Sequence, residues 1–207
     1  MNNICNNLHH IVNKMKRYTF PFNEEELPKN GIYILFEKGE TAHDGDRIVR
    51  VGTHRGDDRL ISRLKEHFIK ENKDRSIFRK NIGRAILNQE DKEFLEQWNW
   101  DLTKKANKDK YLPLLDTKKQ KEIENKVTKY IQENFSFIVI EKKLKSERLD
   151  LESKIISTVS SCQECNPSKL WLGNFSPINK IKESGLWLVQ GLYKTPLNME
   201  NIIKIKE

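Results

Sequence analysis

The feature that most constrains the fold is a pair of short apolar runs, residues 31–37 and 47–52, joined by a loop rich in Gly and Asp. In the first run Ile and Phe occupy every second position, and Tyr33 falls between them on the opposite face, which is typical of a β-strand. A Leu-Pro-Lys-Asn-Gly turn signal precedes that run. The two runs therefore predict a β-hairpin.

A third apolar run, residues 135–140, predicts one more strand, whereas most of the remaining chain has helical periodicity. Helices are expected over residues 59–70, in SIFRKNIGRAIL, near 120–132 and in SERLDLESKIISTVSS. Asp57 and Asp58 suit the start of the first of these helices, because its dipole is positive there. The expected fold class is α+β, with a small three-stranded antiparallel sheet flanked by helices.

The length of 207 residues suits a single domain over residues 1–207. Residues 1–30 are interpreted as an N-terminal extension, helical around Ile11 to Met15, and residues 89–134 as a helical insertion. The C-terminal extension, residues 167–207, has short apolar runs broken by Gly and Pro, which predict edge strands and turns. The core then comprises residues 31–88 and 135–166.

Basic residues outnumber acidic ones by 38 to 30, and the net charge of +8 suits a polyanionic partner such as nucleic acid. The same excess is also expected of a Lys-rich chain from an AT-rich genome, so the charge supports this hypothesis without deciding it. Within SIFRKNIGRAIL, three basic residues oppose the apolar stripe of the helix. This face is the predicted DNA-binding surface, and its members are Arg79, Lys80 and Arg84.

No apolar run reaches the ~18 residues of a membrane-spanning helix, and the first residues lack the apolar core of a signal peptide. A cytoplasmic protein without membrane contact is therefore expected. Its three cysteines include one C-x-x-C, Cys162 and Cys165. No second C-x-x-C and no H-x₃₋₅-H pair completes a zinc site, so plain reduced thiols are expected.

Two placements of polar residues indicate chemistry. Glu152 shares a helix face with Ile155, Ile156 and Val159, so its carboxylate lies where burial is expected and needs a partner, which is either a basic side chain or a divalent cation. On the helix at 59–70, a pair of residues combines a fixed cation with a titratable imidazole on one edge of the apolar stripe. The members of this pair are Arg63 and His67.

The order of these elements resembles the GIY-YIG endonuclease superfamily. Gly31-Ile32-Tyr33 opens a strand, Arg50-Val51-Gly52 closes the next, and the remaining elements follow in the family order. These are Arg63 and His67 on the following helix, Glu152 on the helix after strand three, and Asn166 beyond it. RIVRVGTH, SIFRKNIGRAIL and NPSKLWLG are similar to stretches of a less characterised bacterial branch of that superfamily.

This resemblance implies a role for each matching residue. Glu152 would bind the single divalent metal, Mg²⁺ with Mn²⁺ able to substitute, and Arg63 would hold the scissile phosphate. Tyr33 would lie at the attacking water, either as general base or as the group that orients one, with His67 beside it. Asn166 would be a supporting polar contact. Because a phenol is protonated at neutral pH, Tyr33 needs positive charge nearby.

The chain departs from the family at the second motif, where Arg50 replaces the usual second tyrosine. Arginine stays protonated and cannot act as a base. Alternation with Val49 and Val51 predicts that Arg50 points off the core side of its strand, where it either contacts DNA phosphate or neutralises Tyr33. In either case His54 is a candidate for proton transfer.

The sequence therefore predicts a Mg²⁺-dependent DNA endonuclease of restriction, defence or repair. The alternative is a DNA-binding protein that keeps the fold without efficient cleavage and stacks bases on Trp98 or Trp100. Core packing of these tryptophans is the simpler interpretation. The sequence leaves the oligomeric state, monomer or homodimer, undecided.

Overall fold

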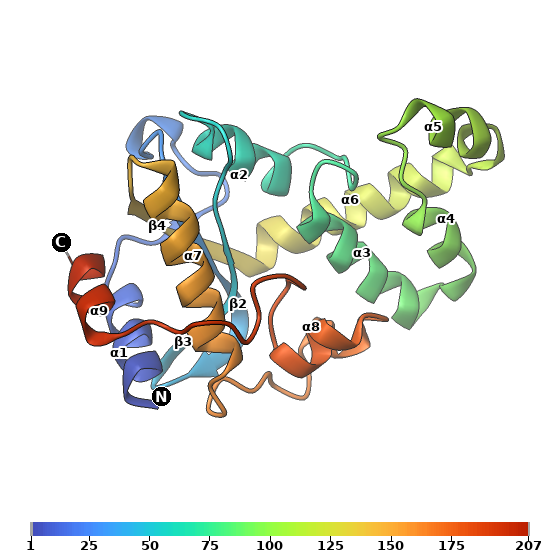
Figure 1. Ribbon diagram of the computed structural model, residues 1–207. Coiled ribbons are helices and arrows are strands. Elements are labelled where there is room, and N and C mark those ends of the chain that lie inside the picture. Colours follow the sequence, from blue (N-terminus) through green and yellow to red (C-terminus); the bar gives the residue numbers. More distant parts are fainter. Residues whose placement is uncertain (1, 207) are drawn as a thin grey trace.

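The computed structural model describes residues 2–206 (Figure 1). Its centre is one antiparallel sheet in the order β1-β4-β2-β3. The strands are β1 Tyr18–Thr19, β2 Gly31–Ala42, β3 Gly45–Gly52 and β4 Phe135–Glu141. The three predicted strands and the α+β class are confirmed, and β1 is an additional strand too short to leave a sequence pattern.

Helices surround the sheet on both faces (Figure 1). The α-helices are α1 Asn2–Val12, α2 Leu60–Phe68, α3 Ile77–Glu90, α4 Leu95–Asn99, α5 Lys105–Tyr111, α6 Thr117–Asn134, α7 Lys145–Ser160, α8 Asn179–Ser184 and α9 Met199–Lys206. Short 3-10 turns are η1 Glu24–Glu26, η2 Lys92–Phe94, η3 Leu112–Leu114 and η4 Leu172–Phe175. No helix within residues 2–206 is both long and apolar enough to cross a bilayer.

The sheet separates two apolar cores, because alternate residues of each strand point to opposite faces. Tyr33 and Leu35 face the core that is closed by α2, α3 and α6. Ile32 and Ile34 face the core that is closed by α1, α7 and α9. The expected two-faced strand is thus confirmed, and both of its faces are buried.

A β-bulge interrupts the register between β2 and β3. Leu35 pairs with Arg50, but the next residue, Phe36, pairs with Ile48, so Val49 is the extra residue. A bulge redirects the side chains beside it. The predicted alternation fails at Val49, which packs in the Tyr33 core while Val51 packs in the other core. Arg50 lies opposite Leu35, on the Tyr33 face of the sheet, away from the side of Val51.

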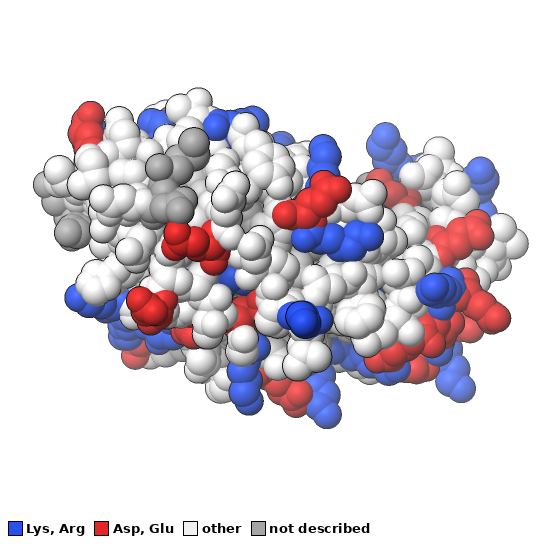
Figure 2. All heavy atoms as spheres, turned by 90° about the horizontal axis from the view of Figure 1, so that it is seen from below, with Lys and Arg blue, Asp and Glu red and all other residues white. Residues whose placement is uncertain are grey.

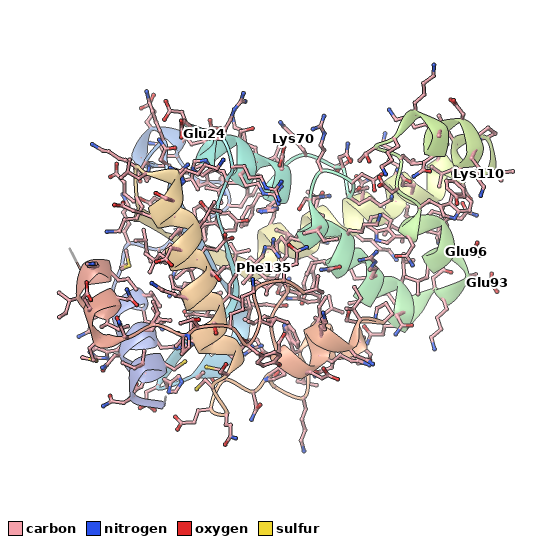
Figure 3. All side chains as sticks on the ribbon, viewed as in Figure 1. Glu24, Lys70, Glu93, Glu96, Lys110 and Phe135 are labelled. Atoms are coloured by element: carbon pink, nitrogen blue, oxygen red, sulfur yellow. The ribbon has the colours of Figure 1, made fainter. Side chains whose placement is uncertain are left out.

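The helical insertion expected over residues 89–134 contains α4, α5 and α6, which extend away from the sheet (Figure 1). Its outer end carries Glu93, Glu96 and Lys110, which point outward in Figure 3. Trp98 is fully buried and donates Nε1–H to the Lys80 carbonyl at 2.9 Å. Trp100 stacks on Tyr111, with ring centroids 4.8 Å apart. Both tryptophans are used in packing, as the simpler interpretation predicted.

Two local predictions are wrong. The segment after residue 167 forms η4, α8 and α9, and contains no strand within the described residues. Its tryptophans, Trp171 and Trp187, are buried and both donate Nε1–H to Glu37 at 2.7 Å, which holds this segment against β2. The first helix ends at Val12, earlier than the region around Ile11 to Met15 that was expected to be helical.

Candidate active site

The site forms where helices from opposite faces of the sheet meet beyond the end of β3. Arg63 comes from α2 on the Tyr33 face, and Glu152 comes from α7 on the other face. Both line one open cavity of about 770 Å³. Its lining residues are Arg50, Thr53, His54, Arg55, Gly56, Arg59, Ser62, Arg63, Glu66, Ile77, Leu149, Glu152 and Gln190.

Tyr33 lies behind the wall of this cavity, in contact with His67. The Tyr33 hydroxyl is 2.7 Å from Nε2 of His67, and Nδ1 of His67 is 2.7 Å from Oγ of Ser76. Ser76 is the N-cap of α3 and accepts the Arg79 N–H. His67 thus lies between two hydroxyl groups, and its tautomer sets which of them it donates to.

His67 is buried between several cationic side chains. Burial, with Arg63, Arg50 and Arg79, holds the pKa of His67 well below its ordinary value. The imidazole is therefore neutral at physiological pH. A neutral ring donates from one nitrogen and accepts at the other, which matches its two neighbours.

The position of the Tyr33 ring explains why the end of β3 has a glycine, Gly52. It pairs directly with Tyr33 across the two strands. A Cβ at this position would lie 2.2 Å from the Tyr33 hydroxyl oxygen and 2.4 Å from Cζ. The phenol therefore lies flat across the Gly52 backbone, and any larger residue would displace it.

Arg50 occupies the position of the usual second tyrosine and is almost completely buried. Its NH1 donates to the Trp187 carbonyl, and its guanidinium lies 5.1 Å from the centroid of the Phe78 ring. Within the described chain its Nε has no hydrogen-bond partner. Burial lowers the pKa of Arg50, while Tyr33 acts to raise it, so the guanidinium interacts electrostatically with the phenol.

Arg63 is held at the cavity wall by two contacts. Its NH1 donates to Oε2 of Glu66 at 2.8 Å and to the Arg75 carbonyl at 2.9 Å. Its side chain keeps 24% of its surface exposed. Arg63 also interacts electrostatically with Tyr33, so it is both fixed in position and accessible to a ligand in the cavity.

Glu152 is the only glutamate that borders both this cavity and the adjoining one of about 420 Å³, among the residues the structure describes. Burial raises the pKa of Glu152, while Arg50, the Thr53 N–H, Arg63 and Arg55 act to lower it. No salt bridge to it forms within residues 2–206. This carboxylate is therefore partly desolvated and surrounded by positive charge at a distance.

Two of the predicted site residues have other contacts. His54 lines the cavity, but its Nδ1 is 2.6 Å from the Gly56 carbonyl and its Nε2 accepts the Gly31 N–H at 3.3 Å. Both ring nitrogens are thus used by the backbone. Asn166 is exposed, donates to the Gln163 carbonyl and does not line the cavity. The structure therefore does not bring Asn166 together with the other site residues.

The prediction of a DNA-binding basic face on α3 is wrong. Arg79 is fully buried and pairs with Glu124 at 2.7 Å, and Lys80 is buried against Asp74 at 3.2 Å. Arg84 donates to the side chains of Asn81 and Asn99. The helical insertion covers this face of α3, so its cations stabilise the packing of α6 and α4 and do not form an open surface.

Sequence reasoning missed the basic residues at the cavity rim, Arg55 and Arg59, which are exposed and lie in the loop between β3 and α2. The signal was present in HRGDDR, but the two aspartates suggested a helix start instead. In fact α2 begins at Leu60 without a side-chain cap, and Asp58 contacts Asn30. On the face drawn in Figure 2, basic and acidic side chains are interspersed without a patch of one sign.

The donor set at Glu152 fits a hard divalent cation. Mg²⁺ is held by one or two carboxylates together with water and substrate phosphates. Glu152 supplies one such carboxylate, which has no direct basic partner within residues 2–206 and faces a cavity wide enough for a phosphate. The positive charge on the cavity wall suits a phosphodiester as the ligand that accompanies the metal.

One comparison with known proteins identifies the family of this chain. The family model described as GIY-YIG domain matches residues 1–198. No match was found among curated proteins or among solved structures. GIY-YIG proteins are nucleases that use a divalent metal. Because the match spans nearly the whole sequence, the chain belongs to the GIY-YIG family of nucleases.

Proposed function

We propose that this protein is a Mg²⁺-dependent endonuclease that hydrolyses phosphodiester bonds in DNA. The observation that carries the proposal is the meeting of Glu152 and Arg63 in one cavity, although they come from helices on opposite faces of the sheet. Packing alone gives no reason for a carboxylate and a tethered guanidinium to share this cavity beside Tyr33.

Arg63 is assigned to the scissile phosphate. A guanidinium can donate two parallel hydrogen bonds to non-bridging oxygens, and its contacts with Glu66 and Arg75 orient it in advance. Such preorganised charge stabilises the negative charge that develops on the phosphate in the transition state. Arg50 adds a second positive charge behind it.

Tyr33, which lies just behind the cavity wall, is assigned to the attacking water, as its general base or as the group that orients one. The Tyr33 hydroxyl contacts Nε2 of His67 and interacts electrostatically with Arg50 and Arg63, which supports this role. His67 is a poor final proton acceptor because burial, together with those cations, holds its pKa well below the ordinary value. His67 is therefore a positioning residue for Tyr33, and Arg50 acts in the same way in place of the second tyrosine.

Glu152 is assigned to Mg²⁺, for which Mn²⁺ can substitute. The ion would supply Lewis-acid stabilisation of charge on the scissile phosphate. The Glu152 carboxylate lines the cavity, and the Thr53 N–H also acts to lower its pKa. Arg55 and Arg59 at the rim would contact neighbouring DNA phosphates, in place of the buried cations of α3.

The test is a plasmid-nicking assay with Mg²⁺ or Mn²⁺. Glu152→Gln keeps the size of the side chain and removes the charge that holds the ion, so cleavage should be lost while DNA binding persists or tightens. Arg63→Ala should lower the cleavage rate by ~100-fold or more. Glu147→Gln is a matched control, because Glu147 is an exposed glutamate on the same helix.

Two outcomes would contradict the proposal. If Glu152→Gln nicks DNA at the wild-type rate, the carboxylate is not the metal ligand. If the wild-type protein binds DNA but cuts none with either ion, the chain is a DNA-binding protein that keeps the family fold. A salt titration of binding separates that case from a protein without affinity for DNA.

A further inference from the structure

A second cluster of polar side chains lies away from the Glu152 cavity, where α1, the β2–β3 turn and the end of α7 meet. Four of its residues place one ligand atom each within 4.8 Å of one another. They are Cys5, His9, His43 and Cys165. Cys162 lies beside them, and none of the five lines the nuclease cavities. We propose that this cluster binds a structural zinc ion.

The distances between donor atoms support this proposal. The Cys5 and Cys165 sulfurs are 3.5 Å apart, and Nε2 of His43 lies 3.5 Å from the Cys165 sulfur and 3.3 Å from that of Cys162. Nδ1 of His9 is 3.6 Å from the Cys5 sulfur. Tetrahedral zinc with Zn–S near 2.3 Å and Zn–N near 2.0–2.1 Å holds its donors about 3.3–3.8 Å apart.

The contacts of His43 are those typical of a metal-bound histidine. Its Nδ1 is 3.1 Å from a Glu164 carboxylate oxygen, while its Nε2 faces the two sulfurs. Metal-bound histidines usually donate their other N–H to a carboxylate or carbonyl, which fixes the tautomer. Only 1% of the His43 side chain is exposed, and a shallow hollow beside the turn provides an entry path.

Cys5, His43 and Cys165 are shared by both donor sets that the geometry allows. The fourth donor is either His9 or Cys162. His9 already accepts the Ile48 N–H through Nε2 at 3.3 Å and contacts the Cys5 carbonyl through Nδ1 at 3.0 Å. His9 must give up one of these contacts to bind the ion, whereas the Cys162 sulfur already lies 3.3 Å from Nε2 of His43.

The chemistry of these donors favours zinc over the ion of the nuclease site. Thiolate and imidazole are softer ligands than carboxylate and suit Zn²⁺, whereas Mg²⁺ prefers oxygen. The cluster offers four ligand atoms, one from each side chain, and these side chains come from three distant segments of the chain. Zinc there would fasten α1 to the hairpin and to the helix that carries Glu152, and its binding free energy would add to folding stability.

The deciding measurement is the metal content of the full-length protein purified without chelator. About one zinc ion per chain is expected, with release of that zinc on titration of the thiols by an organomercurial. Replacement by Co²⁺ should give thiolate-to-cobalt charge transfer and the intense visible bands of tetrahedral cobalt. Glu152→Gln should retain full zinc, so a failure of the nuclease assignment leaves this result unaffected.

Variants then identify the ligands. Cys165→Ala and His43→Asn should each lose the zinc, and the fourth ligand is whichever of His9→Asn and Cys162→Ser loses it as well. Removing zinc should lower the unfolding temperature of the wild-type protein and leave that of Cys165→Ala unchanged. Metal-free wild-type protein with three titratable thiols, or with a Cys5–Cys165 disulfide, would overturn the proposal, even if every variant failed to fold.

Discussion

Replacing Gly52 by alanine adds one methyl group where the Tyr33 ring crosses β3. That carbon would lie 2.2 Å from the phenol oxygen, whereas ordinary van der Waals contact begins at 3.4 Å. Gly52 is held in the strand pairing directly opposite Tyr33, so the ring has to move. Movement of the Tyr33 ring would lengthen the 2.7 Å distance between its hydroxyl and Nε2 of His67.

Both stability and catalysis should suffer. Forcing an extra methyl group into a packed region typically costs about 1–3 kcal/mol of unfolding free energy. A displacement of about 1 Å at a reacting group can lower the rate on the order of 100-fold. DNA binding should change little, because the cavity wall formed by Arg63 and the rim arginines is not touched.

The assays are chemical denaturation and single-turnover nicking. Gly45→Ala is the control, because it lies at the other end of β3, where the three atoms nearest its Cβ all belong to the Asn13 side chain, 2.8–3.3 Å away and far from Tyr33. In a Tyr33→Ala background, Gly52→Ala should cost little further stability, since the obstructing ring is gone. Wild-type stability and cleavage in Gly52→Ala would refute the geometry of Tyr33 described above.

Three further predictions follow from the charges of the site. Because burial raises the pKa of Glu152 in the metal-free protein, the affinity for Mg²⁺ should weaken on acidification at a pH above the ordinary glutamate range near ~4.3; an affinity that is flat down to that range would contradict the assignment. A raised folded-state pKa contributes stability that is present below the unfolded pKa and lost as pH rises through the folded pKa. Metal-free Glu152→Gln should therefore be more stable than wild type at neutral pH, and the denaturation curves of the two proteins should converge in acid. A variant less stable than wild type at neutral pH would show that burying the ionised carboxylate does not destabilise the protein. Arg55→Ala and Arg59→Ala should each weaken DNA binding and reduce the slope of log affinity against log salt by about 1, and an unchanged slope would remove them from the interface.

Local patterns alone predicted much of the fold and part of the site. The three main strands, the helices that follow them and the helical insertion could all be predicted from the sequence, because periodicity depends on neighbouring residues. Tyr33, Arg63 and Glu152 were placed on the right elements for the same reason. The pairing of a carboxylate and a guanidinium in one cavity was expected from the family resemblance, and the structure contains it.

The tertiary structure decided which charged residues are accessible. Arg79 and Lys80 have the spacing of an exposed basic face, yet the insertion folds over α3 and buries them against Glu124 and Asp74. The bulge placed the Val49 side chain on the Tyr33 face and not on the face of Val51, because register depends on the partner strand.

The Cys and His cluster shows the same division between local and tertiary information. From the sequence, Cys162 and Cys165 were one pair without a second, because only ligands close along the chain can be recognised by spacing. Folding brings Cys5 and His9 from the first helix and His43 from a turn to the same point. The sequence determined which donors exist, and the packing of α1 against the hairpin and α7 determined that they meet.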